Sequence, residues 1–240
     1  MYIRIASNDF FAVSKDVVSK MIAGELTAEQ AYQAFNAQLL ADEEPADNET
    51  VLTSGKAYSN VFHANGGSAA FSVMANTLRG VYGTDVLLAT ANSFTGSVLQ
   101  ADYNQKMAAS MIMPNGLMSR QRTMTGAELK ETVHAFVEGC EGGFVPFNRG
   151  SLPVVSGIAV EVKEASGSYT LTGITRNGQP LGDNDTVTVT CLATEKQMEA
   201  LLASDSGTSA GEDTWVKNTW RDYVSGGAAL AEPENYMTLR

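Results

Sequence analysis

Histidine, cysteine and proline are scarce in this sequence, and their scarcity excludes several kinds of site. The 240 residues include two His, two Cys and six Pro. A two-metal hydrolase centre needs several His and Asp residues that converge on ions about 3.5–4 Å apart. His63 and His134 cannot supply such a set, and we expect each to have a structural or surface role. No Cys-x-x-Cys occurs, which excludes a tetrathiolate zinc site.

Positive charge is also scarce. The chain carries 16 Lys and Arg against 27 Asp and Glu, which gives a formal net charge of −11. A nucleic-acid partner needs a basic patch that neutralises phosphates, and no run of Lys or Arg provides one. We therefore predict no nucleic-acid partner. Long apolar runs are missing too, because none approaches the ~20 residues of a membrane-spanning helix, so we predict no membrane span in this chain.

Few features of the sequence indicate the cellular compartment of the protein. Cys140 and Cys191 could pair in an exported protein, but the sequence favours two buried free thiols. The segment from Met1 to Phe11 lacks the charged and then apolar regions of a signal peptide. Two interpretations remain: a cytoplasmic protein, or a part of a longer exported chain.

Enough apolar residues are present, at 44% of the chain, to build a buried core. Apolar residues at helical spacing and at alternate positions are mixed along the chain, which predicts an α+β or layered α/β fold. Helices are predicted as a pair within 12–41 and at 68–82, 125–137, 194–202 and 220–224. Strands are predicted at 85–89, 158–163, 169–174 and 187–191, with an edge strand at 236–240.

Local signals place several boundaries. Thr27–Gln30 and Thr125–Glu128 have the spacing of a capping box, in which the first and fourth residues of the segment cap each other's backbone N–H. Asn177-Gly178 predicts a tight turn. Residues 42–50 form an acidic linker with a helix-stopping proline. We therefore divide the chain into a helical arm with its linker, residues 1–50, and a main domain, residues 51–240.

Catalytic motifs are missing as well. The sequence has no G-x-S-x-G, H-E-x-x-H, P-loop or G-x-G-x-x-G pattern. Its acidic residues gather in the linker and on helix exteriors, as on a solvated face. The residues by themselves indicate a folded domain with no catalytic centre and no cofactor.

The stretch from Gly66 to Arg240 resembles the C-terminal domain of the 5'-nucleotidase family in the order and spacing of its motifs. The matching segments are Ser68–Arg79, Thr84–Ala89, Met124–Lys130, Val154–Val160 and Asn177–Val189. Met124–Lys130 is the most specific of them, because it is similar to the family's Leu-Thr-Gly-x-Glu-Leu helix start. The resemblance implies a layered α/β/β/α domain of the α+β class.

The family resemblance also implies a domain arrangement and a cellular location. Family members are two-domain extracytoplasmic hydrolases, in which the N-terminal domain holds two metal ions and performs the chemistry. The C-terminal domain clamps the nucleoside, and only this domain resembles the present chain. We therefore expect an upstream domain in a longer exported chain, at the cell surface or outside the cell.

Candidate binding residues follow from the family's ligand loops, which are altered here. The family's Asn-Gly-Gly-Gly-Ile-Arg loop corresponds to Ala91–Gly96, without the glycines and the arginine. One family aromatic position is occupied by Asn115, and the family's Gly-Gly-Asp-Gly-Phe/Tyr loop is expected to be missing after Thr194. The candidates are Arg79, Asn92, Ser93, Phe94, Thr95, Asn115 and Thr194. Phe94 either presents a new apolar surface or packs in the core.

Three functions remain open. The chain is a substrate-binding-type domain without catalysis of its own, whose ligand is nucleoside-like. Alternatively, it is a non-enzymatic ligand-binding or interaction module that takes another ligand. The second hypothesis draws on residues 15–40, which are similar to the C-terminal helices of bacterial extracellular solute-binding proteins. The third is a structural spacer, for which a cleft without convergent polar groups would be typical.

Overall fold

The computed structural model describes residues 17, 19–20, 22–27, 30, 49–113, 116–138, 153–165, 168–195, 198 and 207–240. Contacts divide the chain into two units, Met1–Glu49 and Thr50–Arg240. In the first unit the capping box is confirmed, because the N–H of Gln30 donates to Thr27 Oγ1 at 3.2 Å and the N–H of Thr27 to Gln30 Oε1 at 2.9 Å. Most of the predicted helical pair, linker 42–50 and helix 194–202 lies outside the described residues.

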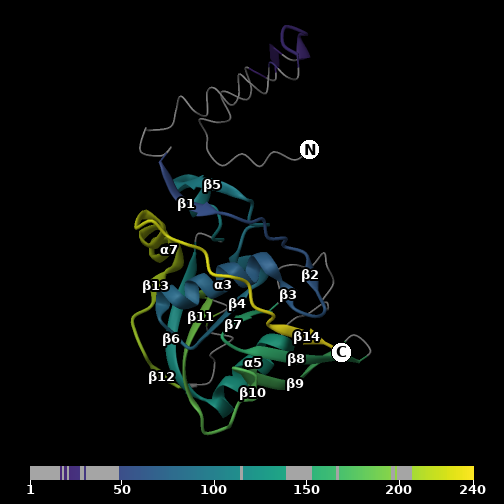
Figure 1. Ribbon diagram of the computed structural model, residues 1–240, viewed down its shortest axis with the longest axis vertical. Coiled ribbons are helices and arrows are strands. Elements are labelled where there is room, and N and C mark those ends of the chain that lie inside the picture. Colours follow the sequence, from purple (N-terminus) through teal and green to yellow (C-terminus); the bar gives the residue numbers. More distant parts are fainter. Residues whose placement is uncertain are drawn as a thin grey trace. The chain divides into compact units, whose positions relative to one another are not determined.

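The second unit contains strands and helices in a mixed order (Figure 1). Its described helices are α3 (Ala69–Tyr82), η2 (Ala91–Ser93), α4 (Gln105–Ala109), α5 (Gly126–Glu138) and α7 (Val216–Ser225). Its described strands are β1 (Thr50–Ser54), β2 (Phe62–His63), β3 (Gly67–Ser68), β4 (Val86–Thr90), β5 (Ala101–Asn104), β6 (Leu117–Thr125), β7 (Pro153–Ser156), β8 (Ala159–Ala165), β9 (Ser168–Arg176), β10 (Gln179–Pro180), β11 (Thr186–Thr194), β12 (Thr208–Ser209), β13 (Thr214–Trp215) and β14 (Met237–Leu239).

The larger sheet has six strands, with the order β12-β6-β11-β4-β7 and β13 also paired to β6. Its centre is apolar, since Val86, Leu88 and Val189 are fully buried. β4 and β11 run parallel, whereas β6 and β7 are antiparallel to their neighbours. The predicted strands at 85–89 and 187–191 are confirmed, and the second is longer than expected.

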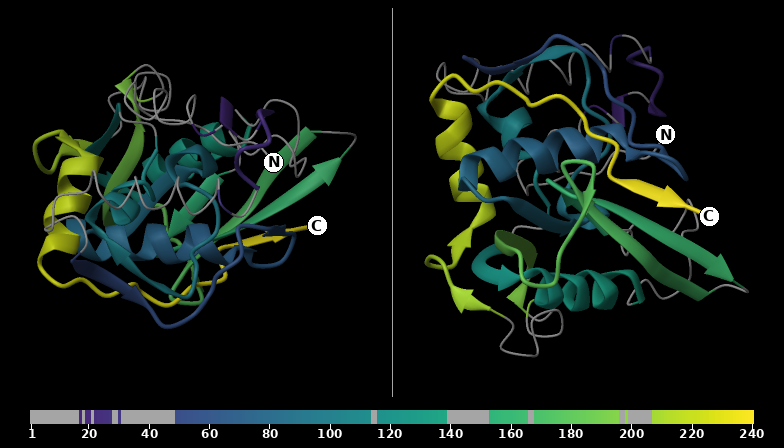
Figure 2. Two further views of the ribbon diagram at one scale, coloured as in Figure 1. Left: turned by 90° about the horizontal axis from the view of Figure 1, so that it is seen from above. Right: turned by 60° about the horizontal axis from the view of Figure 1, so that its bottom comes forward.

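The smaller sheet has the order β10-β9-β8-β14. β8 and β9 form the predicted antiparallel hairpin, which projects as a long ribbon in Figure 2. Asn177 and Gly178 have φ of 52° and 75°, the left-handed values that a tight turn between strands requires. The predicted C-terminal edge strand is confirmed as β14, which pairs in parallel with β8.

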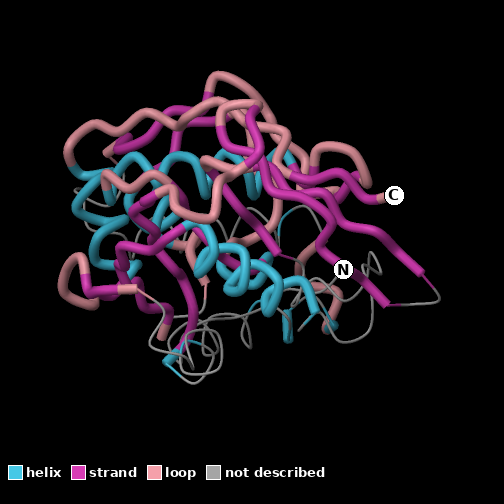
Figure 3. Tube along the Cα trace, turned by 90° about the horizontal axis from the view of Figure 1, so that it is seen from below, coloured by secondary structure: helices cyan, strands magenta, loops and turns pink. Residues whose placement is uncertain are grey.

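Helices connect and cover the sheets, and in the tube view of Figure 3 they lie alongside the strands. Ser68 caps the start of α3, because its hydroxyl accepts the N–H of Phe71, and the helix packs against β4 and β7. α5 contacts both β9 and β6, and so links the two sheets. Its capping box is confirmed, because the N–H of Thr125 donates to Glu128 Oε2 at 2.7 Å and the N–H of Glu128 to Thr125 Oγ1 at 3.2 Å. These layers confirm the predicted α+β class.

Some elements differ from expectation. β6 was not predicted, although its nine residues lie in the middle of the larger sheet between β11 and the short strands β12 and β13. α7 begins four residues earlier than the helix expected at 220–224. His63, for which a structural or surface role was expected, is an exposed residue of the short strand β2.

Cys191 is buried and free, as predicted, while Cys140 lies outside the described residues. Among the helices that the structure describes, none is long and apolar enough to cross a lipid bilayer.

Candidate functional site

Three strand ends meet at one edge of the larger sheet. Because β4 and β11 are parallel and Cys191 pairs with Leu88, Thr194 at the end of β11 is level with Ala91, just after β4. β6 begins at the same edge, since Leu117 pairs with Thr194. Open α/β sheets bind ligands outside the carboxyl ends of their parallel strands. We call this region, which comprises Ala91–Gly96, Thr194 and the start of β6, the β4–β11 edge.

The loop after β4 is held by backbone hydrogen bonds. The N–H of Thr95 donates to the carbonyl of Met111 at 3.0 Å, and the N–H of Met113 donates to the carbonyl of Ser93 at 3.0 Å. Asn92 and Thr95 are exposed at this edge. The structure therefore brings Asn92, Ser93 and Thr95 to the same edge as Thr194.

Ser93 is a buried polar residue of this loop. It is 1% exposed, and its hydroxyl oxygen makes no hydrogen bond to the part of the chain that the structure describes. A buried polar group left without a partner costs about 1–3 kcal/mol. A ligand or water that reaches Ser93 Oγ would therefore gain an interaction that the fold does not itself satisfy.

Phe94 packs in the core. It is 5% exposed, and its ring stacks on Phe71 with the centroids 6.1 Å apart. The alternative in which Phe94 presents a new apolar surface to a ligand is therefore wrong. Phe94 follows η2 with an extended backbone, and it is buried together with Ser93, while Asn92 and Thr95 are exposed.

A large aromatic residue that the sequence analysis missed lies at this edge. Trp215 in β13 pairs with Met118, the second residue of β6, and is 50% exposed. The signal was available, because Gly211-Glu-Asp-Thr-Trp215 has the glycine, aspartate and aromatic spacing of the Gly-Gly-Asp-Gly-Phe/Tyr loop. That loop was expected directly after Thr194 and considered missing, but a motif with its spacing occurs further along the chain.

Asp213 of the same motif is held by Arg120 of β6. The guanidinium donates to the Asp213 carboxylate at 3.0 Å from Nε and at 2.6 Å from Nη2. These hydrogen bonds raise the pKa of Arg120 above its ordinary value. The pair fixes the strand that carries Trp215 against β6.

Arg79 lies at the other end of β4. Its Nε donates to Ser156 Oγ at 2.9 Å, and its Nη2 donates to Asn76 Oδ1 at 2.8 Å and lies 3.6 Å from Glu234. It lines a polar cavity of about 430 Å³ together with Asp85, which precedes β4. The structure therefore does not bring Arg79 to the other candidate residues. Asn115 lies outside the described residues.

No cluster of three or more His, Cys, Asp or Glu able to hold a metal ion occurs within the described ranges. His63 is in β2 and His134 is in α5, so these two imidazoles belong to separate elements.

No protein-family profile matches the chain, and no curated protein sequence matches it. Solved structures do resemble it. A 5'-nucleotidase precursor from Thermus thermophilus is 14% identical with a TM-score of 0.60, and the match covers 88% of this chain and 43% of that one. The sulfate thiohydrolase SoxB of the same organism is 15% identical with a TM-score of 0.62, and the match covers 90% and 40%. The NAD nucleotidase of Haemophilus influenzae is 16% identical with a TM-score of 0.60, and the match covers 90% and 46%.

The chain spans less than half the length of each of these proteins. At such low identity the likeness establishes the fold alone. The fold is that of the C-terminal domain of 5'-nucleotidase family proteins, as the sequence motifs predicted.

Proposed function

We propose that this chain is the ligand-binding domain of a longer 5'-nucleotidase-like protein and that it does not hydrolyse its ligand. The observation that carries the proposal is the half-exposed indole of Trp215, which lies beside the ends of β6 and β11. A solvated aromatic face next to polar loop residues suits a ligand that combines a planar ring with hydroxyl groups. Stacking of a base on an aromatic side chain contributes about 1–3 kcal/mol.

The polar groups of the edge favour a nucleoside-like ligand over a nucleotide. Asn92, Ser93 and Thr194 offer amide and hydroxyl groups, and Ala91–Gly96 contains no basic residue. Arg120 lies on β6 near Met118, beyond Ser119, and it is already paired with Asp213. A phosphate would therefore find no unengaged guanidinium in this loop or in that pair, and a buried anion without a partner is unfavourable.

Any hydrolysis would then belong to an upstream domain that holds the metal ions. The setting that we propose is a bacterial protein at the cell surface or outside the cell. The fold likeness to a 5'-nucleotidase precursor and to a NAD nucleotidase supports this setting.

A thermal-shift experiment tests the proposal. Adenosine should raise the melting temperature of the chain, and AMP should raise it no further at equal concentration. The effect should be lost in Trp215→Ala. Leu99→Ala is the matched control, because Leu99 is 59% exposed and belongs to none of the strand ends that form the edge. If AMP, adenosine and UDP-sugars all leave the melting temperature unchanged, the nucleoside-binding proposal is refuted.

The altered loop favours a second candidate function, a non-enzymatic ligand-binding or interaction module of an extracellular solute-binding-type protein. In that case the β4–β11 edge binds a ligand that contains no nucleobase. This candidate would be supported if no nucleoside raises the melting temperature and an unrelated metabolite does, provided that Trp215→Ala abolishes the latter effect.

A further inference from the structure

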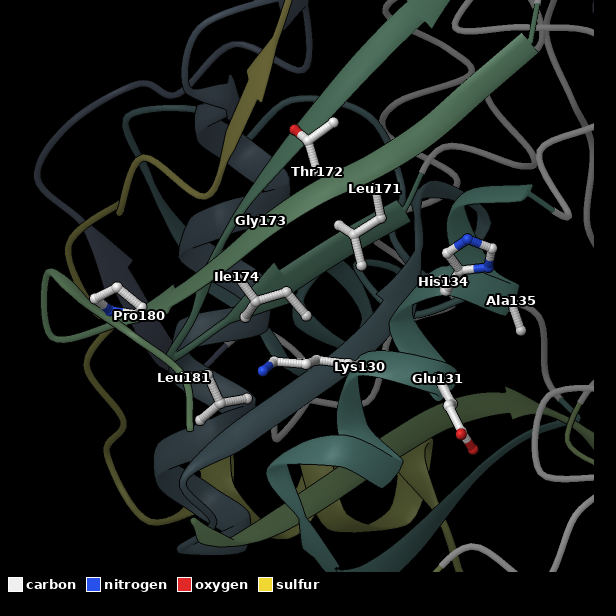
Figure 4. A pocket seen from close by; sticks show the side chains of 10 residues that line it. All are labelled: Lys130, Glu131, His134, Ala135, Leu171, Thr172, Gly173, Ile174, Pro180 and Leu181. Carbon is white, nitrogen blue, oxygen red and sulfur yellow. The ribbon is translucent and has the colours of Figure 1, made fainter. Parts of the chain in front are cut away.

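A second cavity lies between α5 and β9, and its lining residues come from neither the loop after β4 nor β13 (Figure 4). Its volume is about 770 Å³. Small-molecule sites in proteins have volumes of roughly 300–1,000 Å³ and combine an apolar lining with a few polar groups. The size of this cavity is therefore that of a ligand site.

A β-bulge shapes the apolar wall of the cavity. Val162 pairs with Leu171 and Glu161 pairs with Gly173, so Thr172 is an extra residue in β9. Its hydroxyl donates to the carbonyl of Glu161 at 3.2 Å. Such an insertion shifts the alternation of side chains along the strand. As a result Leu171 and Ile174 both point towards α5, as Figure 4 shows.

Lys130 supplies the positive charge at the polar end of the cavity. The side chain of Lys130 extends from α5 towards Ile174 and Leu181, while the carboxylate of Glu131 points away from them (Figure 4). Lys130 Nζ donates to Asp183 Oδ1 at 2.6 Å, and the Asp183 side chain is 72% exposed. An ammonium group has three donors, so the bond to Asp183 leaves capacity for a further acceptor.

We propose that this cavity binds a small amphipathic molecule, whose apolar chain or ring lies along Leu171, Ile174 and Leu181 and whose anionic head group is bound by Lys130. The bulge supplies the apolar wall, and the ammonium group sets the sign of the head group. Asp183 competes for the same ammonium, so it weakens the binding of an anion.

Octanoate and 1-octanol are suitable probes, because they share an apolar chain and differ in head-group charge. Binding to the full chain is followed by amide chemical shifts in ¹H–¹⁵N NMR spectra, which also locate the ligand. We expect octanoate to shift the amides of Ala135 and Gly173, and to bind more tightly than 1-octanol.

Three variants sharpen this test. Leu171→Ala should weaken the binding of octanoate and of 1-octanol alike, because Leu171 points into the cavity from β9 and supplies part of its apolar wall (Figure 4). Lys130→Gln should weaken octanoate binding by about tenfold, the size of a charge-assisted hydrogen bond, and leave 1-octanol unaffected. Asp183→Asn should strengthen octanoate binding by about two- to fivefold, since it removes an exposed ion pair.

Lys163→Gln is the matched control, because Lys163 is exposed in β8 and its loss changes the net charge equally. The proposal is overturned if 1-octanol binds as tightly as octanoate, if Lys163→Gln weakens octanoate binding as much as Lys130→Gln does, or if Asp183→Asn weakens it. Failure of the probes to shift Ala135 and Gly173 also overturns it. Trp215→Ala should leave octanoate binding intact, so this outcome is independent of the proposed nucleoside site.

Discussion

The contact between Gly67 and Tyr236 joins the C-terminal segment to the start of α3. Gly67 has a φ of +77°, in the left-handed region, and a Cβ atom at this position would overlap the ring of Tyr236. Tyr236 is fully buried, and its hydroxyl accepts the N–H of Ser68 at 3.2 Å. Replacement of Gly67 by Ala must therefore either move the ring or move the backbone that precedes α3.

The expected loss of stability has two parts. An L-residue with left-handed dihedrals costs about 1–2 kcal/mol. Displacement of a buried aromatic side chain approaches the cost of its removal, about 3–5 kcal/mol. The two parts sum to about 4–7 kcal/mol. Because the ring is displaced and not removed, we expect the low end of this range, a loss of about 4 kcal/mol in the free energy of unfolding, which is a large share of the roughly 5–15 kcal/mol that stabilises a domain.

Urea unfolding followed by circular dichroism measures this loss. Gly227→Ala is the matched control, because Gly227 has a φ of +79° with no atom within 4 Å of the added Cβ. The control isolates the backbone cost of about 1–2 kcal/mol. In the background of Tyr236→Ala, the extra penalty of Gly67→Ala should disappear. Equal losses for Gly67→Ala and Gly227→Ala would refute the reasoning, because the ring would then exert no constraint.

Three further predictions concern local interactions. The Asp85 carboxylate accepts the N–H and the hydroxyl of Thr188, both at 2.9 Å, and pairs with Arg176, and these contacts lower its pKa below the ordinary 3.8. Asp85→Asn should therefore lower the free energy of unfolding by roughly 2 kcal/mol above pH ~4, measured by urea unfolding. This difference should vanish as the pH falls through the lowered pKa. Thr125→Ala removes the capping hydroxyl of α5 and should lower the free energy of unfolding by about 1 kcal/mol in the same assay, whereas Thr125→Ser should retain most of it. Burial raises the pKa of Cys191 to about 12, so in a Cys140→Ser variant at pH 8 the native thiol should not react with a disulfide reagent until urea unfolds the chain.

Sequence reasoning predicted the elements whose signal is local. The Thr125–Glu128 capping box, the Asn177-Gly178 turn and the alternating strands around them are all confirmed. In each case the residues that fix the backbone are neighbours along the chain, so spacing alone carries the information. The motif order then identified the fold, which the solved structures confirm at identities of 14–16%.

β6 escaped prediction because its position depends on partners that are distant in the sequence. Its residues Leu117–Thr125 include two arginines and a glutamine, a composition that suggests a surface segment. The strand nevertheless pairs along its whole length with β11, and Arg120 is accommodated by its ion pair with Asp213. Long-range pairing of this kind overrides local propensity.

The structure brings part of the candidate residue set together. The loop Asn92–Thr95 and Thr194 lie at one edge because β4 and β11 are parallel. Arg79 is at the opposite end because a helix that packs beside β4 ends where that strand begins. The aromatic motif was expected directly after Thr194, at the end of β11. Trp215 was missed because other residues intervene between Thr194 and the motif in this chain.

Fluorescence titration of Trp215 is the most direct measurement of the central claim. Trp220 is fully buried and donates to the carbonyl of Ala108, so it supplies a constant background that Trp215→Phe isolates. We expect adenosine to quench or shift the emission of Trp215 in a saturable manner, and the same protein with divalent cations to release no phosphate from AMP. Emission of Trp215 that does not respond to adenosine, or phosphate released by the purified chain, would contradict the account of a non-hydrolytic ligand-binding domain.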